Sequence, residues 1–104
     1  MKKLTSADSI DELLSQHEYS LLYFTASWCG PCKSMSPIVE GVSGMMSDRF
    51  NTIKVDIDNL ASVAADYGIR SVPTLMLVKN DEIIDQRVGG LPPQQIMQWL
   101  EQLT

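Results

Sequence analysis

Apolar residues recur three or four positions apart in several segments of the chain, which is the spacing of an amphipathic helix. Before the first of these segments, Ser9 and Glu12 form a capping box, so we expect a helix that starts there and ends near His17. A longer helix should follow Cys32 and kink at Pro37, since proline lacks the backbone N–H of a regular helix. Its apolar stripe, which we expect to fill the core, consists of Met35, Ile38, Val39, Val42, Met45 and Met46.

Two more helices are predicted toward the end of the chain. A short helix should begin at Asn59 and end at Gly68, because glycine readily adopts the left-handed conformation that terminates a helix. The last helix should begin at Pro92 and Pro93, and its apolar stripe places Trp99 in the core.

Strands are predicted between these helices. Leu21–Ala26 is almost uninterruptedly apolar, which is typical of a central strand covered on both faces. Residues 52–57 alternate between polar and apolar, so the second strand should have one polar face. Thr74–Val78 and Glu82–Val88 are separated by three residues and should form an antiparallel hairpin. This order predicts one α/β domain over residues 1–104, with a central mixed sheet of four to five strands flanked by helices on both faces.

Composition and charge exclude several classes of function. The formal net charge of -5, from 13 acidic and 8 basic residues, leaves no electrostatic footprint for nucleic acid. No apolar run approaches the roughly 18 residues of a membrane-spanning helix, so we expect no membrane partner. The polar stretch Thr5–Glu12 lacks the apolar core of an export signal, so we expect a cytoplasmic protein.

The two cysteines lie three positions apart, between the buried strand and the long helix. Two cysteines in a reducing compartment argue against a structural disulfide framework. At a helix start, free backbone N–H groups and the positive end of the dipole stabilise a thiolate, so Cys29 should be nucleophilic at neutral pH. Gly30 lets a substrate backbone approach closely, and Pro31 fixes one dihedral angle. The pattern therefore predicts a redox-active pair of Cys29 and Cys32.

The cysteines belong to a longer motif, Trp-Cys-Gly-Pro-Cys-Lys at residues 28–33, and Pro37 follows the second cysteine by five positions. Two further segments accompany it, namely Val72, Pro73 and Thr74, and Val88, Gly89 and Gly90. With these residues the chain resembles the thioredoxin family over essentially its whole length. The motif is that family's signature, the first segment matches its cis-proline loop, and the second resembles the rest of its binding face.

The resemblance implies a thioredoxin fold and a general protein-disulfide reductase. The more exposed Cys29 would attack a substrate disulfide, and the shielded Cys32 would resolve the mixed disulfide. No cofactor would be bound, because the electrons come from NADPH through a separate thioredoxin reductase. We expect a monomer whose partners are this reductase and disulfide-containing proteins. The implied substrate-binding face consists of Trp28, Gly30, Pro31, Val72, Pro73, Thr74, Val88, Gly89 and Gly90.

The resemblance also implies residues that support the cysteine pair. These are Trp28, Gly30, Pro31, Lys54, Asp58 and Pro73. Trp28 should shield the disulfide and offer apolar area to partners. Asp58 matches a family position close to this tryptophan, so we expect Asp58 to accept a hydrogen bond from the Trp28 indole N–H.

Tyr23 is the most consequential departure from the family pattern, because it stands where relatives usually place a buried aspartate. The other departures are Thr25 in place of a frequent tryptophan and Pro92 in place of a capping serine. A phenol stays protonated at neutral pH and cannot take the proton that Cys32 must lose. Water is the simplest substitute and Asp56 the second, since Asp56 shares the polar strand face with Lys54. Tyr23 would instead donate a hydrogen bond locally.

Three alternative interpretations of the cysteine pair are weaker. Cys-x-x-Cys is also half of a four-cysteine zinc site, but the other half is missing, and the single histidine, His17, should lie on a distant helix. A structural bridge, or a pair of unreactive core thiols, is the second alternative. The third is a non-catalytic subunit that binds partners through the same apolar face. We therefore expect no metal site.

Overall fold

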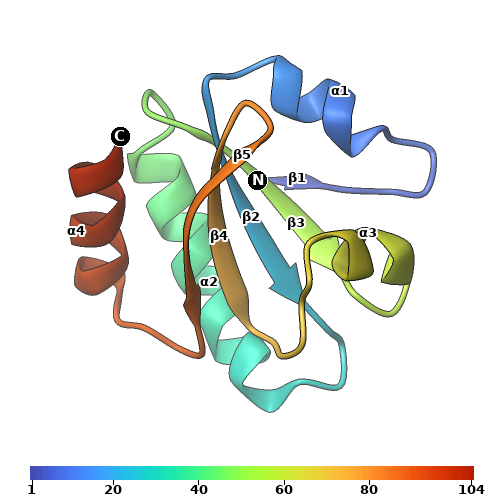
Figure 1. Ribbon diagram of the computed structural model, residues 1–104. Coiled ribbons are helices and arrows are strands. Elements are labelled where there is room, and N and C mark those ends of the chain that lie inside the picture. The colour runs from blue at the N-terminus through green and yellow to red at the C-terminus, as the bar shows by residue number, and fades with distance from the viewer.

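The computed structural model describes residues 1–104, which form five strands and four helices (Figure 1). In chain order these are β1 (Lys2–Lys3), α1 (Ile10–Ser15), β2 (Tyr19–Thr25), α2 (Gly30–Met45), β3 (Asn51–Asp56), α3 (Ala61–Asp66), β4 (Thr74–Lys79), β5 (Glu82–Val88) and α4 (Pro93–Leu103). The predicted succession of helices and strands is confirmed. Only β1 was not expected, because its two exposed lysines carry no periodic pattern.

The apolar strand β2 lies at the centre of a single mixed sheet. The strand order is β1-β3-β2-β4-β5, and β2 pairs parallel with β3 and antiparallel with β4. Six of the seven residues of β2 are buried, as expected for a strand covered on both faces. The predicted hairpin of β4 and β5 is antiparallel, so the mixed sheet is confirmed.

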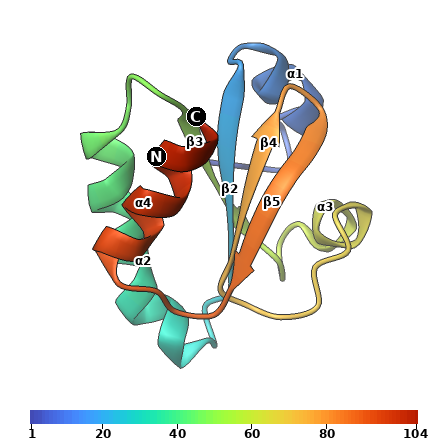
Figure 2. The same cartoon turned by 60° about the vertical axis from the view of Figure 1, so that its left-hand side comes forward.

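Helices cover both faces of the sheet, with α2 and α4 on one face and α1 and α3 on the other (Figures 1 and 2). Two apolar clusters result, because alternate residues of each strand point to opposite faces. On the face of α2 and α4 the cluster includes Leu21, Tyr23, Met35, Val39, Leu77 and Ile96. On the other face it includes Leu14, Leu22, Phe24, Ile53, Val55 and Met76. None of the helices has the length and apolar character needed to cross a membrane.

The ends of the helices are formed by the residues that the sequence predicted there. The Ser9 hydroxyl accepts a hydrogen bond from the Glu12 backbone N–H at 3.3 Å, as the capping box predicts. Gly68 has a φ of +68°, the left-handed conformation expected after α3. Pro92 is the N-cap of α4 and Pro93 its first residue, which confirms the predicted start.

The expected core role of the methionine stripe is wrong at one position. Met35 and Met46 are buried, with 2% and 3% of their surface exposed, whereas Met45 is 71% exposed. Met45 is the last residue of α2 and lies seven positions after the half-buried Ile38, at the edge of the apolar stripe. No element covers that edge where the helix ends. His17 is exposed and follows α1 rather than lying in it.

One polar contact fastens α4 to the edge strand β5. The Trp99 indole N–H donates to the Asp85 carboxylate at 2.9 Å, and Arg87 donates to the same oxygen at 2.8 Å. The Arg87 guanidinium also lies over the Trp99 ring, 5.0 Å from its centre. Trp99 itself is 6% exposed, so its predicted place in the core is confirmed. The hydrogen bond from Trp99 holds the pKa of Asp85 below its ordinary value.

Replacing Asp85 with asparagine should lower the free energy of unfolding at pH 7, because the charge-assisted bonds to Trp99 and Arg87 are weakened. A carboxylate with a depressed folded pKa contributes stability above its unfolded value, near 3.9, and loses it as the pH falls through the folded value. Urea unfolding should therefore show a difference that shrinks toward zero in acid. The exposed Asp48→Asn variant is the control, and a difference for Asp85→Asn that stays constant down to about pH 2 contradicts the assignment.

Candidate active site

The cysteine pair lies between the end of the central strand β2 and the first turn of the long helix α2. Cys29 is the N-cap of α2, and Cys32 lies in its first turn. The two cysteines form a disulfide with a Cα–Cα distance of 5.2 Å. Their exposed fractions are 4% and 2%, so exposure in the oxidised protein hardly separates the two, although Cys29 was expected to be the more exposed.

A backbone hydrogen bond points directly at the sulfur of Cys29. The N–H of Cys32 donates to the Cys29 Sγ at 3.2 Å, in the geometry that a serine or aspartate oxygen uses at other helix starts. Cys29 has the extended conformation of an N-cap residue, with φ -84° and ψ 112°. A negative charge on this sulfur would be stabilised by this hydrogen bond and by the positive end of the α2 dipole. The predicted stabilisation of a Cys29 thiolate therefore has a defined donor.

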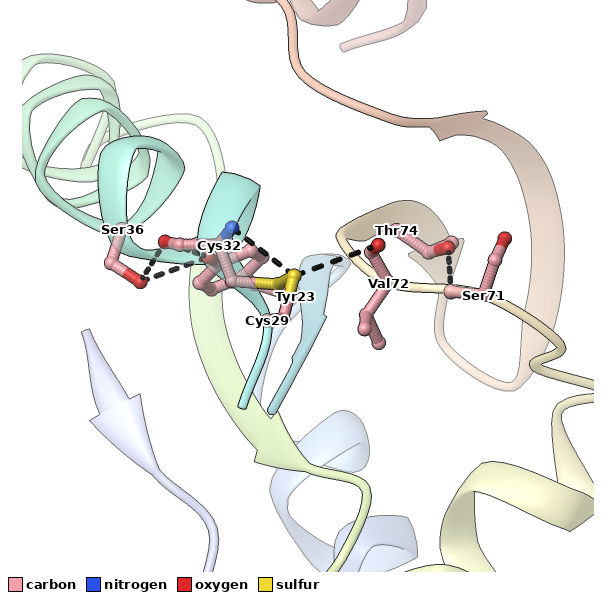
Figure 3. Close-up of a disulfide and its surroundings, with 7 residues drawn as sticks. All are labelled: Tyr23, Cys29, Cys32, Ser36, Ser71, Val72 and Thr74. Atoms are coloured by element: carbon pink, nitrogen blue, oxygen red, sulfur yellow. Dashed lines mark hydrogen bonds between the residues drawn. A yellow bond between two sulfur atoms is a disulfide. The ribbon is translucent and has the colours of Figure 1, made fainter. Parts of the chain in front are cut away.

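The loop before β4 faces the disulfide from the side opposite α2 (Figure 3). The Val72–Pro73 peptide bond is cis, as the resemblance implied. The Val72 carbonyl oxygen lies 3.7 Å from the Cys29 sulfur, and Val72 packs against the small cluster of Ala26, Cys29 and Cys32. The loop is held by two hydrogen bonds, from the Thr74 hydroxyl to the Ser71 carbonyl at 2.8 Å and from the Gly89 N–H to the Pro73 carbonyl at 2.9 Å.

The residues expected on the binding face lie around the start of α2 and the loop before β4. Trp28 and Val88 are the most exposed apolar side chains there, at 66% and 59%. Val88 is brought to the site because it pairs with Thr74 in the sheet. Gly30, Pro31 and Gly90 are exposed as well, and Gly30 has no heavy atom within 4 Å of the position that a Cβ would occupy. Space for a close approach of another backbone is therefore present beside the disulfide.

The predicted hydrogen bond between Trp28 and Asp58 is wrong. The structure contains no bond from the Trp28 indole, whose side chain projects into water, and the one indole bond is that of Trp99. Asp58 instead belongs to a turn in which its backbone N–H donates to the Asp56 carboxylate at 2.9 Å. Its own side chain is exposed. Asp58 thus takes part in a local turn through its backbone and makes no hydrogen bond with the Trp28 indole.

Tyr23 forms a small hydroxyl network behind the disulfide (Figure 3). The side chain is completely buried, and its hydroxyl donates to the Cys32 carbonyl at 3.2 Å. The Ser36 hydroxyl lies 2.9 Å from the Tyr23 oxygen and donates to the same carbonyl at 2.9 Å. The local hydrogen bond expected of Tyr23 is therefore confirmed. Every polar atom of this network is uncharged, so no buried charge lies beneath the cysteines.

A cavity of about 290 Å³ opens beside Cys32 on the same face of the sheet. Lys54 and Asp56 line it from β3, and Lys33 and Ser36 line it from α2. The alternation in β3 explains this placement, because Ile53 and Val55 turn to the opposite face. Lys54, expected as a supporting residue, therefore lies close to the pair.

Two residues near the pair were not anticipated from the sequence. Ser36 lies four positions after Cys32, so the helical repeat could have placed both on one face of α2. Ile57, the residue after β3, packs against the cluster of Ala26, Cys29 and Cys32, and nothing in its alternating pattern distinguished it from a core residue.

No group of three or more His, Cys, Asp or Glu side chains is arranged to hold a metal ion.

Comparison with known proteins agrees with this geometry. A family model described as Thioredoxin matches residues 1–102. A thioredoxin of Mycoplasmoides gallisepticum is 35% identical over 101 residues, which cover 97% of this chain and 100% of that protein. Thioredoxin 1 of Synechococcus elongatus is 40% identical over 89 residues, which cover 86% and 83% respectively. A structure of Plasmodium falciparum thioredoxin covers 100% of both chains with a TM-score of 0.90 and 33% identity. The chain belongs to the thioredoxin family.

Family membership and a cysteine pair at disulfide distance together define the activity. The protein is a dithiol–disulfide oxidoreductase with the thioredoxin fold, and it acts as a protein-disulfide reductase. The motif, the fold and the class of reaction expected from the sequence are therefore confirmed.

Replacing Tyr23 with aspartate should destabilise the protein by roughly 3–5 kcal/mol at neutral pH, because it opens a cavity and buries a carboxylate. Burial raises the pKa of such an aspartate, so the loss should be smallest below about pH 4 and grow as the pH rises toward the folded value. Urea unfolding from about pH 4 to pH 9 measures this.

Tyr23→Phe is the matched control for that variant. It removes only the hydroxyl and should cost about 1 kcal/mol without the rise across this pH range. If Tyr23→Asp is as stable as the parent at the alkaline end, the site does not exclude charge as described.

Proposed function

We propose that Cys29 is the nucleophile of the reductase and that Cys32 resolves the mixed disulfide. The observation that carries this assignment is the hydrogen bond from the Cys32 N–H to the Cys29 sulfur. A helix N-terminus aimed at one sulfur of the pair stabilises the thiolate of that residue in preference to the other. Cys32, buried in the first turn of α2, has no such donor to its sulfur.

The proposed reaction has two exchanges. The Cys29 thiolate attacks one sulfur of a substrate disulfide, so that a mixed disulfide forms and the first substrate sulfur leaves as a thiolate. The Cys32 sulfur then attacks Cys29, which forms the Cys29–Cys32 disulfide and releases the second substrate sulfur. Two electrons pass from the protein to the substrate.

The proposed binding face uses the exposed apolar residues around the pair. Trp28 and Val88 offer apolar area on either side of the cysteines. Gly30 and Pro31, at the start of α2, and Gly90 provide backbone that a substrate segment can approach. Val72, Pro73, Thr74 and Gly89 form the wall opposite α2, and the Val72 carbonyl faces Cys29.

Recycling completes the proposed function. The oxidised protein would be reduced by a thioredoxin reductase with electrons from NADPH, since the chain has no bound cofactor of its own in this scheme. We place the protein in the cytoplasm as a monomeric single domain over residues 1–104. The support is the family assignment and a sequence that has a single pair of cysteines, both used by the reaction.

Replacing Cys32 with serine should trap a covalent complex with a disulfide substrate, because the attack on substrate is intact and the resolving thiol is absent. Non-reducing gel electrophoresis and mass spectrometry should detect stoichiometric complex at Cys29. Cys29→Ser is the matched variant, and it should accumulate at least about tenfold less complex at neutral pH. Equal or greater trapping by Cys29→Ser reverses the assignment of nucleophile and resolving thiol.

A further inference from the structure

Resolution of the mixed disulfide needs a thiolate on Cys32, so a proton must first leave that buried sulfur. The buried Tyr23 offers only a neutral hydroxyl, which donates to the Cys32 carbonyl at 3.2 Å and lies 2.9 Å from the Ser36 hydroxyl. The Ser36 hydroxyl is likewise neutral and donates to the same carbonyl. Neither hydroxyl is a base at neutral pH. The acceptor must therefore lie elsewhere.

The cavity beside Cys32 is the open side of this site. Its volume of about 290 Å³ leaves room for several water molecules, because one occupies about 30 Å³ in the liquid. Water has polar partners there in Ser36, Lys54 and Asp56. A chain of water can thus connect the Cys32 side of the cavity to the side chains of β3.

The charged groups around the cavity differ in what they can do with a proton. Lys33 from α2 and Lys54 from β3 are ammonium groups, which donate and cannot accept. They favour a negative charge on Cys32. Asp56 is the only carboxylate that lines the cavity. The other titratable side chains that line it are Cys32, Lys33 and Lys54.

Asp56 is also fixed in place by its own turn. One carboxylate oxygen, Oδ1, accepts the backbone N–H of Asp58 at 2.9 Å and lies 3.4 Å from the N–H of Asn59. No protein donor binds the second oxygen, Oδ2. A carboxylate that is held by one oxygen keeps the other available for water.

We propose that Asp56 accepts the Cys32 proton through water in this cavity, and so takes the place of a buried acid behind the cysteines. This inference rests on the proposed roles of Cys29 and Cys32. As the S–H bond of Cys32 breaks, its proton passes to a water molecule that gives its own proton to Asp56. The Cys32 sulfur bonds to Cys29, and the bond between Cys29 and the substrate sulfur breaks. The substrate leaves as a thiolate, and Asp56 returns its proton to solvent.

The test uses Asp56→Asn, which keeps the Oδ1 acceptor of the turn and removes the base. The reduced protein is mixed in a stopped-flow instrument with an aromatic disulfide whose thiolate is coloured. One coloured thiolate is released on attack by Cys29 and a second on resolution by Cys32, so the two steps are timed separately. Unfolding midpoints confirm that each variant is folded.

Asp56→Asn should slow the second release at least about tenfold at pH 7 and leave the first release within about twofold of the parent. Above about pH 9 the two proteins should converge, since a thiol with a reference pKa near 8.5 ionises there without help. Asp56→Glu, which keeps a carboxylate, should recover part of the rate. Asp48→Asn makes the same change in charge on a distant exposed loop and should not alter either step.

A purely electrostatic role of Asp56 predicts the opposite change in the rate of resolution. If Asp56 acts only through its negative charge, its removal favours the Cys32 thiolate and makes resolution faster at pH 7. A faster or unchanged second release in Asp56→Asn overturns the proposal. If the parent shows no first release from Cys29, the proposed function fails instead, whatever the variant does.

Discussion

The hydrogen bond from the Cys32 N–H to the Cys29 sulfur is the contact on which the rest of the site depends. It exists because the central strand β2 ends at Thr25 and α2 begins five residues later at Gly30, with Cys29 as its cap. The helix cannot shift along this strand, since Met35, Val39 and Val42 bury its apolar face against the sheet. Packing far from the cysteines therefore holds the donor in line with the sulfur that it stabilises.

The network behind the disulfide shows a second constraint, which is the cost of burying charge. Tyr23 fills the core completely and satisfies the Cys32 carbonyl together with Ser36. A buried carboxylate at this position would have to be desolvated or protonated. With a phenol at this position, the charged groups lie at the edge of the site, where Lys54 and Asp56 line the cavity beside Cys32. Stability and proton transfer are thus assigned to different residues.

Much of the fold was predictable because its signals are local. The apolar run of β2, the capping serine of α1 and the glycine after α3 each determine their element within a few residues. The motif at residues 28–33 likewise identified the reactive pair. By contrast, β1 has two residues and no pattern, and it forms only because Lys2 and Lys3 can pair with β3.

The contacts between segments were predicted less well than the segments themselves. The bond expected between Trp28 and Asp58 does not form: the Trp28 side chain is 66% exposed, and Asp58 takes part only through its backbone N–H in a turn closed by Asp56. A family position indicates which side chains are near one another and not whether a hydrogen bond forms between them. The cavity beside Cys32 depends on how α2 lies over β3, which no single segment encodes.

The central claim, that the start of α2 stabilises a thiolate on Cys29, is tested most directly by the pH dependence of alkylation. The reduced protein is treated with iodoacetamide over a range of pH, and peptide mapping follows each cysteine separately. We predict that Cys29 is modified before Cys32 and that its rate is half-maximal at least about one pH unit below the 8.5 of a free thiol. A Cys29 rate that rises only around pH 8.5, or faster modification of Cys32, would contradict the claim.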